Sequence, residues 1–172
     1  MRKTFVLAAA SALLTLALPA LGLAQEKAPP GNRELSLALD TVWVLVAAVL
    51  VLFMQAGFAM LEVGFSRMKN VGSVVAKILA NLAIAAVLFW AVGFAVAFGT
   101  GNALFGTQGW FLAVPEGAVD EVYAGLAWTQ VPLSAKFLFQ VAFCAVSLAI
   151  VWGTMLERTK FAVYLVFAVV FA

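Results

Sequence analysis

Two phenylalanines, Phe139 and Phe143, stand four residues apart in a strongly apolar stretch of this chain. On a helix, side chains at positions i and i+4 project from the same face, so the two rings are expected to lie side by side. Two phenyl faces at the mouth of a membrane passage attract a desolvated cation by about 2 kcal/mol or more. The same spacing is equally typical of rings that pack in a core or face lipid. Spacing alone therefore leaves both a cation site and ordinary packing open.

Glu62 and Gln55 are polar residues inside another apolar stretch, and their separation of seven places both on one helix face. Inserting an ionisable side chain into a membrane costs about 2.5–3.5 kcal/mol, so such a residue is a candidate for function. Glu62 is either a proton relay or a structural brace that accepts hydrogen bonds from a helix end or pairs with Lys69 or Lys77. Its position near the end of the stretch favours the brace, while Gln55 lies nearer the middle.

The composition limits what chemistry this protein performs. Hydrophobic residues make up 66% of the 172 residues and charged residues 10%, against about 25% charged in soluble proteins. The mean hydropathy of +1.11 is that of an integral membrane protein, whose surroundings are the lipid bilayer. The chain has no histidine and one cysteine, Cys144, so we expect no metal, no cofactor and no enzyme activity. No basic patch indicates a nucleic-acid partner.

The N-terminal segment is predicted to be a secretory signal peptide covering residues 1–24. Two basic residues precede an apolar stretch that ends in small residues, as such peptides require. That stretch is short for a membrane span, and an uncleaved anchor is the alternative. Residues 25–39 are then an exposed periplasmic segment. They lead to a helix start at Asp40 or Thr41, both good N-cap residues.

The remaining residues, 40–172, are expected to form apolar helices. The predicted spans cover about 41–65, 71–98, 137–155 and 161–172. A complete span needs about 20 residues, so the last stretch is predicted to be truncated and the chain to be a fragment of a longer protein. The fold class is therefore an all-α polytopic membrane protein.

The distribution of charge predicts the orientation of these spans. The two short connections carry basic residues, namely Arg67 and Lys69 in one and Arg158 and Lys160 in the other. The long connection, 99–136, carries the acidic residues Glu116, Asp120 and Glu121. By the positive-inside rule the short connections face the cytoplasm and the mature N-terminus lies outside, in a plasma (inner) membrane. The aromatic residues of the long connection suit either interfacial anchors or the lining of an entrance.

Residues 52–71, LFMQAGFAMLEVGFSRMKNV, resemble the first-span signature of the ammonium transporter (Amt/Mep/Rh) family. Three further stretches agree with that family in order and spacing. They are DTVW at 40–43, FGTGNALFG at 98–106, and FQVAF at 139–143 with ERTKF at 157–161. The resemblance covers nearly all of residues 40–172.

The resemblance implies an eleven-span channel-like transporter that assembles as a homotrimer, each protomer having its own narrow hydrophobic pore. In that family ammonium is recruited at an outer aromatic site and loses its proton. It then crosses as ammonia past two pore histidines while the proton moves separately. By position, Phe143 resembles the phenylalanine of the recruitment site and outer gate, and Phe139 resembles its neighbour.

The resemblance also sets expectations for what lies outside this chain. Both pore histidines and the other site residues are expected beyond Ala172, so the fragment is not expected to transport alone. Docking of a PII-type regulator on the cytoplasmic face is left open, because it depends on a tail outside these residues.

Other classes of function give different expectations. An ammonium-sensing membrane domain coupled to a signalling module is the main alternative, and a long soluble extension downstream would distinguish it from a transporter. The half-length last span argues against a self-contained four-span adaptor. An intramembrane serine protease is disfavoured by the lack of histidine.

Overall fold

The computed structural model describes residues 31–155 and 158–172. The chain divides into two units, Met1–Leu35 and Ser36–Ala172, and only residues 31–35 of the first unit are described. The predicted signal peptide, residues 1–24, lies outside the described residues, and so do residues 25–30 of the predicted periplasmic segment.

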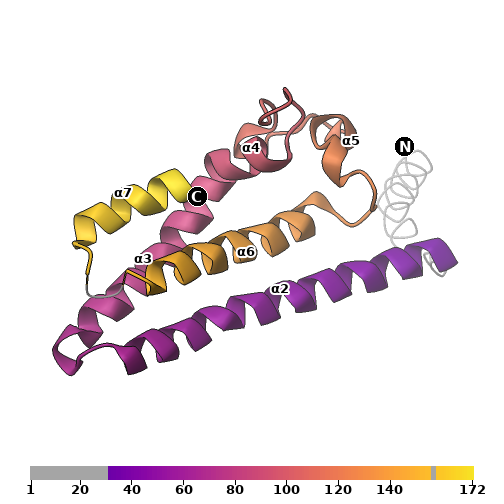
Figure 1. Cartoon of the computed structure of the whole chain (residues 1–172). Coiled ribbons are helices and arrows are strands. Elements are labelled where there is room, and N and C mark those ends of the chain that lie inside the picture. The colour runs from indigo at the N-terminus through magenta and orange to yellow at the C-terminus, as the bar shows by residue number, and fades with distance from the viewer. Residues whose placement is uncertain (1–30, 156–157) are drawn as a thin grey trace, which may run out of the picture. The chain divides into compact units, whose positions relative to one another are not determined.

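The first described helix, α2, spans Asn32–Phe65 (Figure 1). It starts well before Asp40 and Thr41, so the predicted helix start is wrong. Thr41 does not act as a cap, because its hydroxyl donates to the carbonyl oxygen of Leu37 at 2.7 Å, the bond made by a threonine inside a helix. Residues 33–39 are mostly of types that favour helices, and the helix continues through them.

A continuous helical run follows after a short turn. The turn contains the 3₁₀ helix η1, Met68–Asn70. The run consists of α3 at Val71–Leu88, a π turn η2 at Phe89–Gly93, and α4 at Phe94–Phe98. The run covers residues 71–98, the range predicted for the second span.

Two more helices complete the second unit: α6 at Leu133–Gly153 and α7 at Phe161–Phe171. The start of α6 lies one turn before the predicted 137. The carbonyl oxygen of Pro132 accepts the backbone N–H groups of Ala135 and Lys136 at 3.0 and 3.2 Å, which forms the first turn. The long connection therefore ends at residue 132.

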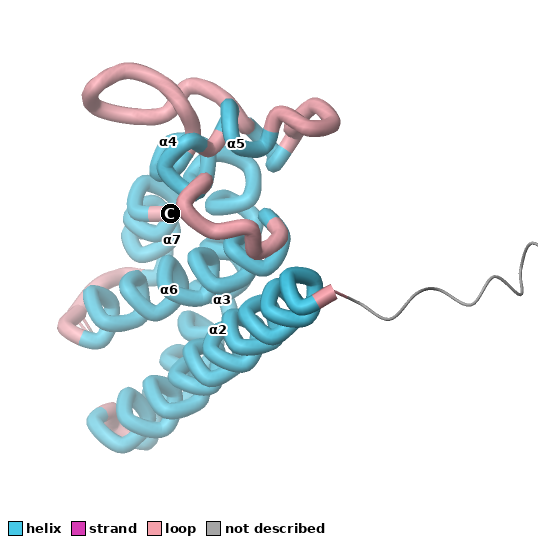
Figure 2. The backbone as a smooth tube through the Cα atoms, turned by 90° about the vertical axis from the view of Figure 1, so that its right-hand side faces the viewer, coloured by secondary structure: helices cyan, strands magenta, loops and turns pink. Residues whose placement is uncertain are grey.

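Helices α3, α6 and α7 pack against one another within Ser36–Ala172 (Figures 1 and 2). Small residues of α6 allow the close approach; Ala142, Ala145 and Ala149 are all buried. The Asn81 side chain of α3 donates from Nδ2 to the carbonyl oxygen of Ala145 at 3.0 Å, so a hydrogen bond also joins α3 to α6.

A second buried cluster joins α6 to α7. Its four buried residues are Leu148, Trp152, Tyr164 and Ala168. The rings of Trp152 and Tyr164 lie 4.0 Å apart between centroids. Aromatic contact thus holds the two helices together near the end of α6.

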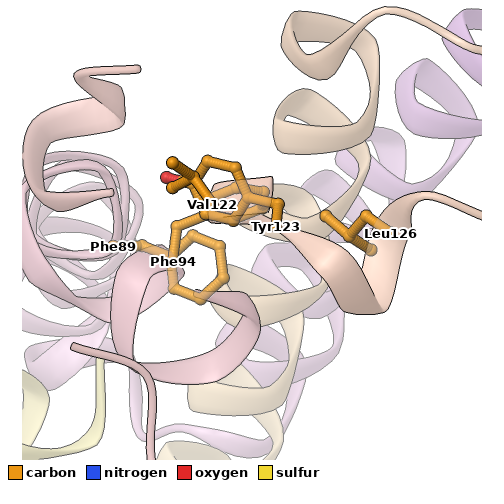
Figure 3. Packing of buried hydrophobic residues seen from close by; sticks show 5 residues of the cluster. All are labelled: Phe89, Phe94, Val122, Tyr123 and Leu126. Atoms are coloured by element: carbon orange, nitrogen blue, oxygen red, sulfur yellow. The ribbon is translucent and has the colours of Figure 1, made fainter. Parts of the chain in front are cut away.

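The long connection folds around Tyr123, which is fully buried. It contains the short helices η3 (Trp110–Leu112), α5 (Val119–Val122) and η4 (Ala124–Leu126). The Tyr123 hydroxyl donates to the Gly109 carbonyl oxygen at 2.7 Å, and burial raises the pKa of Tyr123. Figure 3 shows the Tyr123 ring packed with Phe94, whose centroid lies 5.0 Å away.

Three of the described helical segments are long and apolar enough to cross a membrane. They are Asn32–Phe65, Met68–Phe98 and Leu133–Gly153, while Phe161–Phe171 is apolar but shorter. Apart from an isolated bridge between Gly101 and Gly106, the regular structure in the described part of the chain is helical. The all-α prediction is therefore confirmed, and the total of eleven spans stays a prediction.

Gly93, at the end of the π turn, offers a test of this packing. A Cβ atom there would collide with the Ala172 carbonyl oxygen at the end of α7 and would lie 2.7 Å from Phe89 Cδ2. We expect Gly93→Ala in the complete gene product to lower stability by about 1–3 kcal/mol through overpacking. Thermal unfolding in detergent measures this.

The matched control is Gly72→Ala, because a Cβ atom at Gly72 has nothing within 4 Å. It should leave the unfolding temperature unchanged or raise it slightly, since alanine favours a helix. Equal unfolding temperatures for the two variants would contradict the close approach of α7 to α3.

Candidate functional site

The side chains of Phe139 and Phe143 lie together on α6. Their ring centroids are 4.9 Å apart, with the ring planes tilted by 55°. Phe143 is 41% exposed and Phe139 is partly buried in the described part of the chain. The two rings therefore lie side by side, as their spacing predicts, and part of the Phe143 side chain is exposed.

A cavity of about 510 Å³ lies beside this aromatic pair, where the long connection meets the first half of α2 and the start of α6. The residues that line it come from these three segments. They are Asp40, Trp43, Val44 and Ala47 of α2, Leu126, Trp128, Thr129 and Val131 of the connection, and Lys136, Phe139 and Gln140 of α6. Phe139 belongs to both features, since its ring contacts Phe143 and also lines the cavity.

The lining of the cavity includes aromatic rings and a carboxylate, which are groups that attract cations. Trp43 and Trp128 are 75% and 83% exposed, so their faces are available in the described part of the chain. Asp40 adds an exposed carboxylate. Aromatic faces and a carboxylate together attract a positive ligand by the ring quadrupole and by charge.

Lys136 provides a positive charge in the cavity wall, but its hydrogen bonds serve the structure. Its Nζ donates to the carbonyl oxygens of Leu126 and Thr129, both at 2.7 Å. The carboxylate of Asp120 acts electrostatically on the same ammonium group. Lys136 therefore fixes the end of the long connection to α6 and shapes the cavity.

Gln55 and Glu62 lie on α2 outside this cavity and are buried, with 7% and 3% of their surfaces exposed. Among the residues that the structure describes, neither the Gln55 amide nor the Glu62 carboxylate has a hydrogen-bond partner. The structure thus brings Phe139 and Phe143 together and leaves Gln55 and Glu62 as a separate polar pair.

The sequence analysis did not assign Trp43, Trp128 and Asp40 to a site. The sequence did contain a signal for these residues, because aromatic and acidic side chains at the ends of apolar stretches indicate positions at a membrane surface. That they line one cavity depends on a contact between α2 and the long connection, which local spacing does not contain.

Several apolar helices of spanning length, a folded connection at one end and an aromatic cavity beside it define a multi-pass helical membrane protein. A sequence model of the Ammonium Transporter Family matches residues 42–172. The chain belongs to this family, as the resemblance predicted.

Curated relatives agree with this membership. Ammonium transporter Amt2 of Archaeoglobus fulgidus is 44% identical over 135 residues, which cover 78% of this chain and 26% of the relative. A putative ammonium transporter of Synechocystis is 38% identical over 131 residues, covering 76% of this chain and 22% of the relative. Ammonium transporter 3 of Dictyostelium discoideum is 37% identical over 139 residues, which cover 80% of this chain and 28% of the relative. The chain thus spans about a quarter of the length of these relatives.

The role of Lys136 in shaping the cavity is testable with Lys136→Met in the complete gene product. Two carbonyl oxygens lose their donor, so we expect local stability to fall by about 1–3 kcal/mol. Hydrogen–deuterium exchange should rise in residues 124–132. Lys69→Met is the control, because Lys69 is exposed and far from the cavity in sequence. Unchanged exchange in Lys136→Met would contradict the role.

Proposed function

We propose that this chain is the front portion of an ammonium transporter that recruits ammonium at the aromatic cavity beside Phe139 and Phe143. The observation that carries the proposal is the pair of rings 4.9 Å apart next to a cavity that also contains Asp40, Trp43 and Trp128. Membership of the Ammonium Transporter Family and the names of the relatives support ammonium as the substrate.

Phe143 forms part of the recruitment site and outer gate in this proposal, and Phe139 lies beside it. The ring faces replace part of the water lost by the cation. Ammonium then leaves its proton behind, and ammonia crosses between apolar helices. A neutral molecule avoids the large cost of carrying a charge through hydrocarbon surroundings.

The complete protein in this proposal has eleven spans and forms a homotrimer in the plasma membrane. A cleaved signal peptide places the mature N-terminus outside, and the basic residues of the short connections face the cytoplasm. Docking of a PII-type regulator there is compatible with this orientation. The alternative of an ammonium-sensing domain is less well supported, because the relatives carry the names of transporters.

Substitution of Phe143 tests the aromatic site in the complete gene product. Phe143→Leu keeps an apolar side chain but removes the ring face, so the apparent affinity for methylammonium should weaken about five- to thirtyfold, equivalent to roughly 1–2 kcal/mol. Uptake of labelled methylammonium over a range of concentrations measures the change.

Phe143→Tyr is the matched control, since it keeps the aromatic face and should retain affinity within about twofold. Unchanged uptake by Phe143→Leu across the whole concentration range would remove Phe143 from the site. A similar loss in both variants would show that packing around position 143, and not the ring face, is what matters.

The second test concerns residues 1–172 expressed alone. We expect cells that produce only these residues to take up no more labelled methylammonium than cells without them, because most of the pore is proposed to lie in the other spans. Immunoblotting of the membrane fraction confirms that the polypeptide is present. Uptake above the background in such cells would contradict the proposal that the remaining spans are required.

A further inference from the structure

Helix α2 has two polar side chains, Gln55 and Glu62, on its buried face. Within α2, all of which the structure describes, the buried residues are Ala48, Gln55 and Glu62. They stand seven residues apart and therefore form one narrow line along the helix. Exposed apolar side chains, such as Phe53 and Met60, lie on the other faces of α2. A polar line that faces inward does not serve solubility and calls for a specific explanation.

The end of this line lies among the other helices of the unit Ser36–Ala172. A Cβ atom built on Gly153 of α6 would lie 3.5 Å from Glu62 Oε1, so the carboxylate faces α6 at a position without a side chain. Lys77 of α3 and Tyr164 of α7 are the titratable groups that act electrostatically on Glu62. The carboxylate is thus close to three helices.

The polar groups nearest to Glu62 are directed elsewhere. Lys77 Nζ lies 4.6 Å from the centroid of the Trp152 ring. The Tyr164 hydroxyl donates to the Lys77 carbonyl oxygen at 3.1 Å. Across the described helices, neither oxygen of Glu62 receives a hydrogen bond. The carboxylate therefore has an opposite charge nearby but no donor, which does not fit a simple brace.

Other polar atoms continue this pattern. In the described part of the chain, the Gln55 amide, Asn81 Oδ1 and Trp152 Nε1 are buried and also lack hydrogen-bond partners. Together with the two oxygens of Glu62, these atoms comprise four acceptor oxygens and two donor nitrogens. Such a set of unpaired acceptors suits a bound molecule that supplies hydrogen-bond donors, such as protonated water.

A small cavity lies between the start of α3 and the start of α7. It has a volume of about 190 Å³ and is lined in part by Ser73, Lys77 and Thr159. Lys77 therefore borders the cavity and also acts electrostatically on Glu62. In the proposed orientation the cavity opens toward the cytoplasm, because it lies next to the short connections.

We propose that Glu62 is the proton-binding residue in the cytoplasmic half of this transporter, and that it exchanges its proton with water in the cavity beside Lys77. The inference rests on the proposed function. Ammonium dissociates into ammonia and a proton, the Glu62 carboxylate accepts the proton to become a carboxylic acid, and the acid returns it to cytoplasmic water. The carboxylate is regenerated, and no electrons are transferred. Gln55 holds water along the line that leads to Glu62.

The experiment uses the complete gene product in proteoliposomes and records two quantities after an ammonium pulse. One is the electrical current, which reports proton movement, and the other is the change of internal pH due to ammonia entry. We expect Glu62→Gln to lower the ratio of current to ammonia entry about tenfold. Glu62→Asp, which keeps a carboxyl group, should restore most of the ratio.

Glu34→Gln is the matched control, because it removes a carboxylate from an exposed position on the same helix and should leave the ratio unchanged. If the protein without substitutions takes up ammonium but Glu62→Gln keeps the full ratio, Glu62 is only structural and the inference is overturned. Ammonium uptake without any current would overturn it as well. Absence of ammonium uptake before any substitution would instead overturn the proposed function, and the inference with it.

A measurement on the protein without substitutions covers the case in which Glu62→Gln fails to fold. A hydrophobic carbodiimide reacts with protonated carboxyl groups inside membranes. We expect mass spectrometry to find the adduct on Glu62, with a matching loss of current. Labelling that leaves Glu62 unmodified, or an adduct at Glu62 that leaves the current intact, would overturn the inference.

Discussion

The absence of water in a membrane interior is the constraint on which this structure depends. Each backbone N–H and C=O group in the hydrocarbon layer needs a partner within the protein, and a helix supplies it locally. The described chain follows this rule, since its long segments are helical and its irregular backbone lies in the connections between them. Strained residues such as Phe111 and Leu112, both with φ of 56°, occur in the long connection. There, the buried Tyr123 hydroxyl donates to the Gly109 carbonyl oxygen.

The lack of water in the membrane interior also determines where the charged and polar side chains lie. Charged groups at the cavity end, Asp40 and Lys136, lie where the helices meet the long connection. Glu62 and Lys77 lie toward the opposite ends of α2 and α3. Between them α2 contributes one amide to the buried face, that of Gln55. The proposed separation of ammonia from its proton uses this arrangement, because a neutral molecule crosses apolar surroundings while a proton needs polar groups at intervals.

The sequence contained most of the helical architecture, because long apolar stretches have few alternatives in a membrane. The run from Val71 to Phe98 and the pairing of Phe139 with Phe143 follow from hydropathy and from helical spacing. The start of α2 did not follow, because Thr41 has the same side chain whether it caps a helix or bonds backward inside one. The cavity did not follow from the sequence either, because its lining residues Trp43 and Trp128 are distant in sequence and meet only through a tertiary contact.

The π turn at Phe89–Gly93 has a consequence for how this family member can change in evolution. A π turn accommodates one more residue than an α-helical turn, so α4 follows α3 nearly in the phase of a regular helix that is one residue shorter. Loss of a single residue within the turn would therefore restore a regular helix and leave α4 nearly in place, whereas the same loss from α3, with the π turn kept, would rotate everything after it by about 100°. Phe94, which contacts Phe89, Tyr123 and Phe137, would then turn away from Tyr123 and Phe137. The fold of the long connection is thus tied to the phase of the helical run before it, and the π turn is the place where that run can lose a residue without changing its phase.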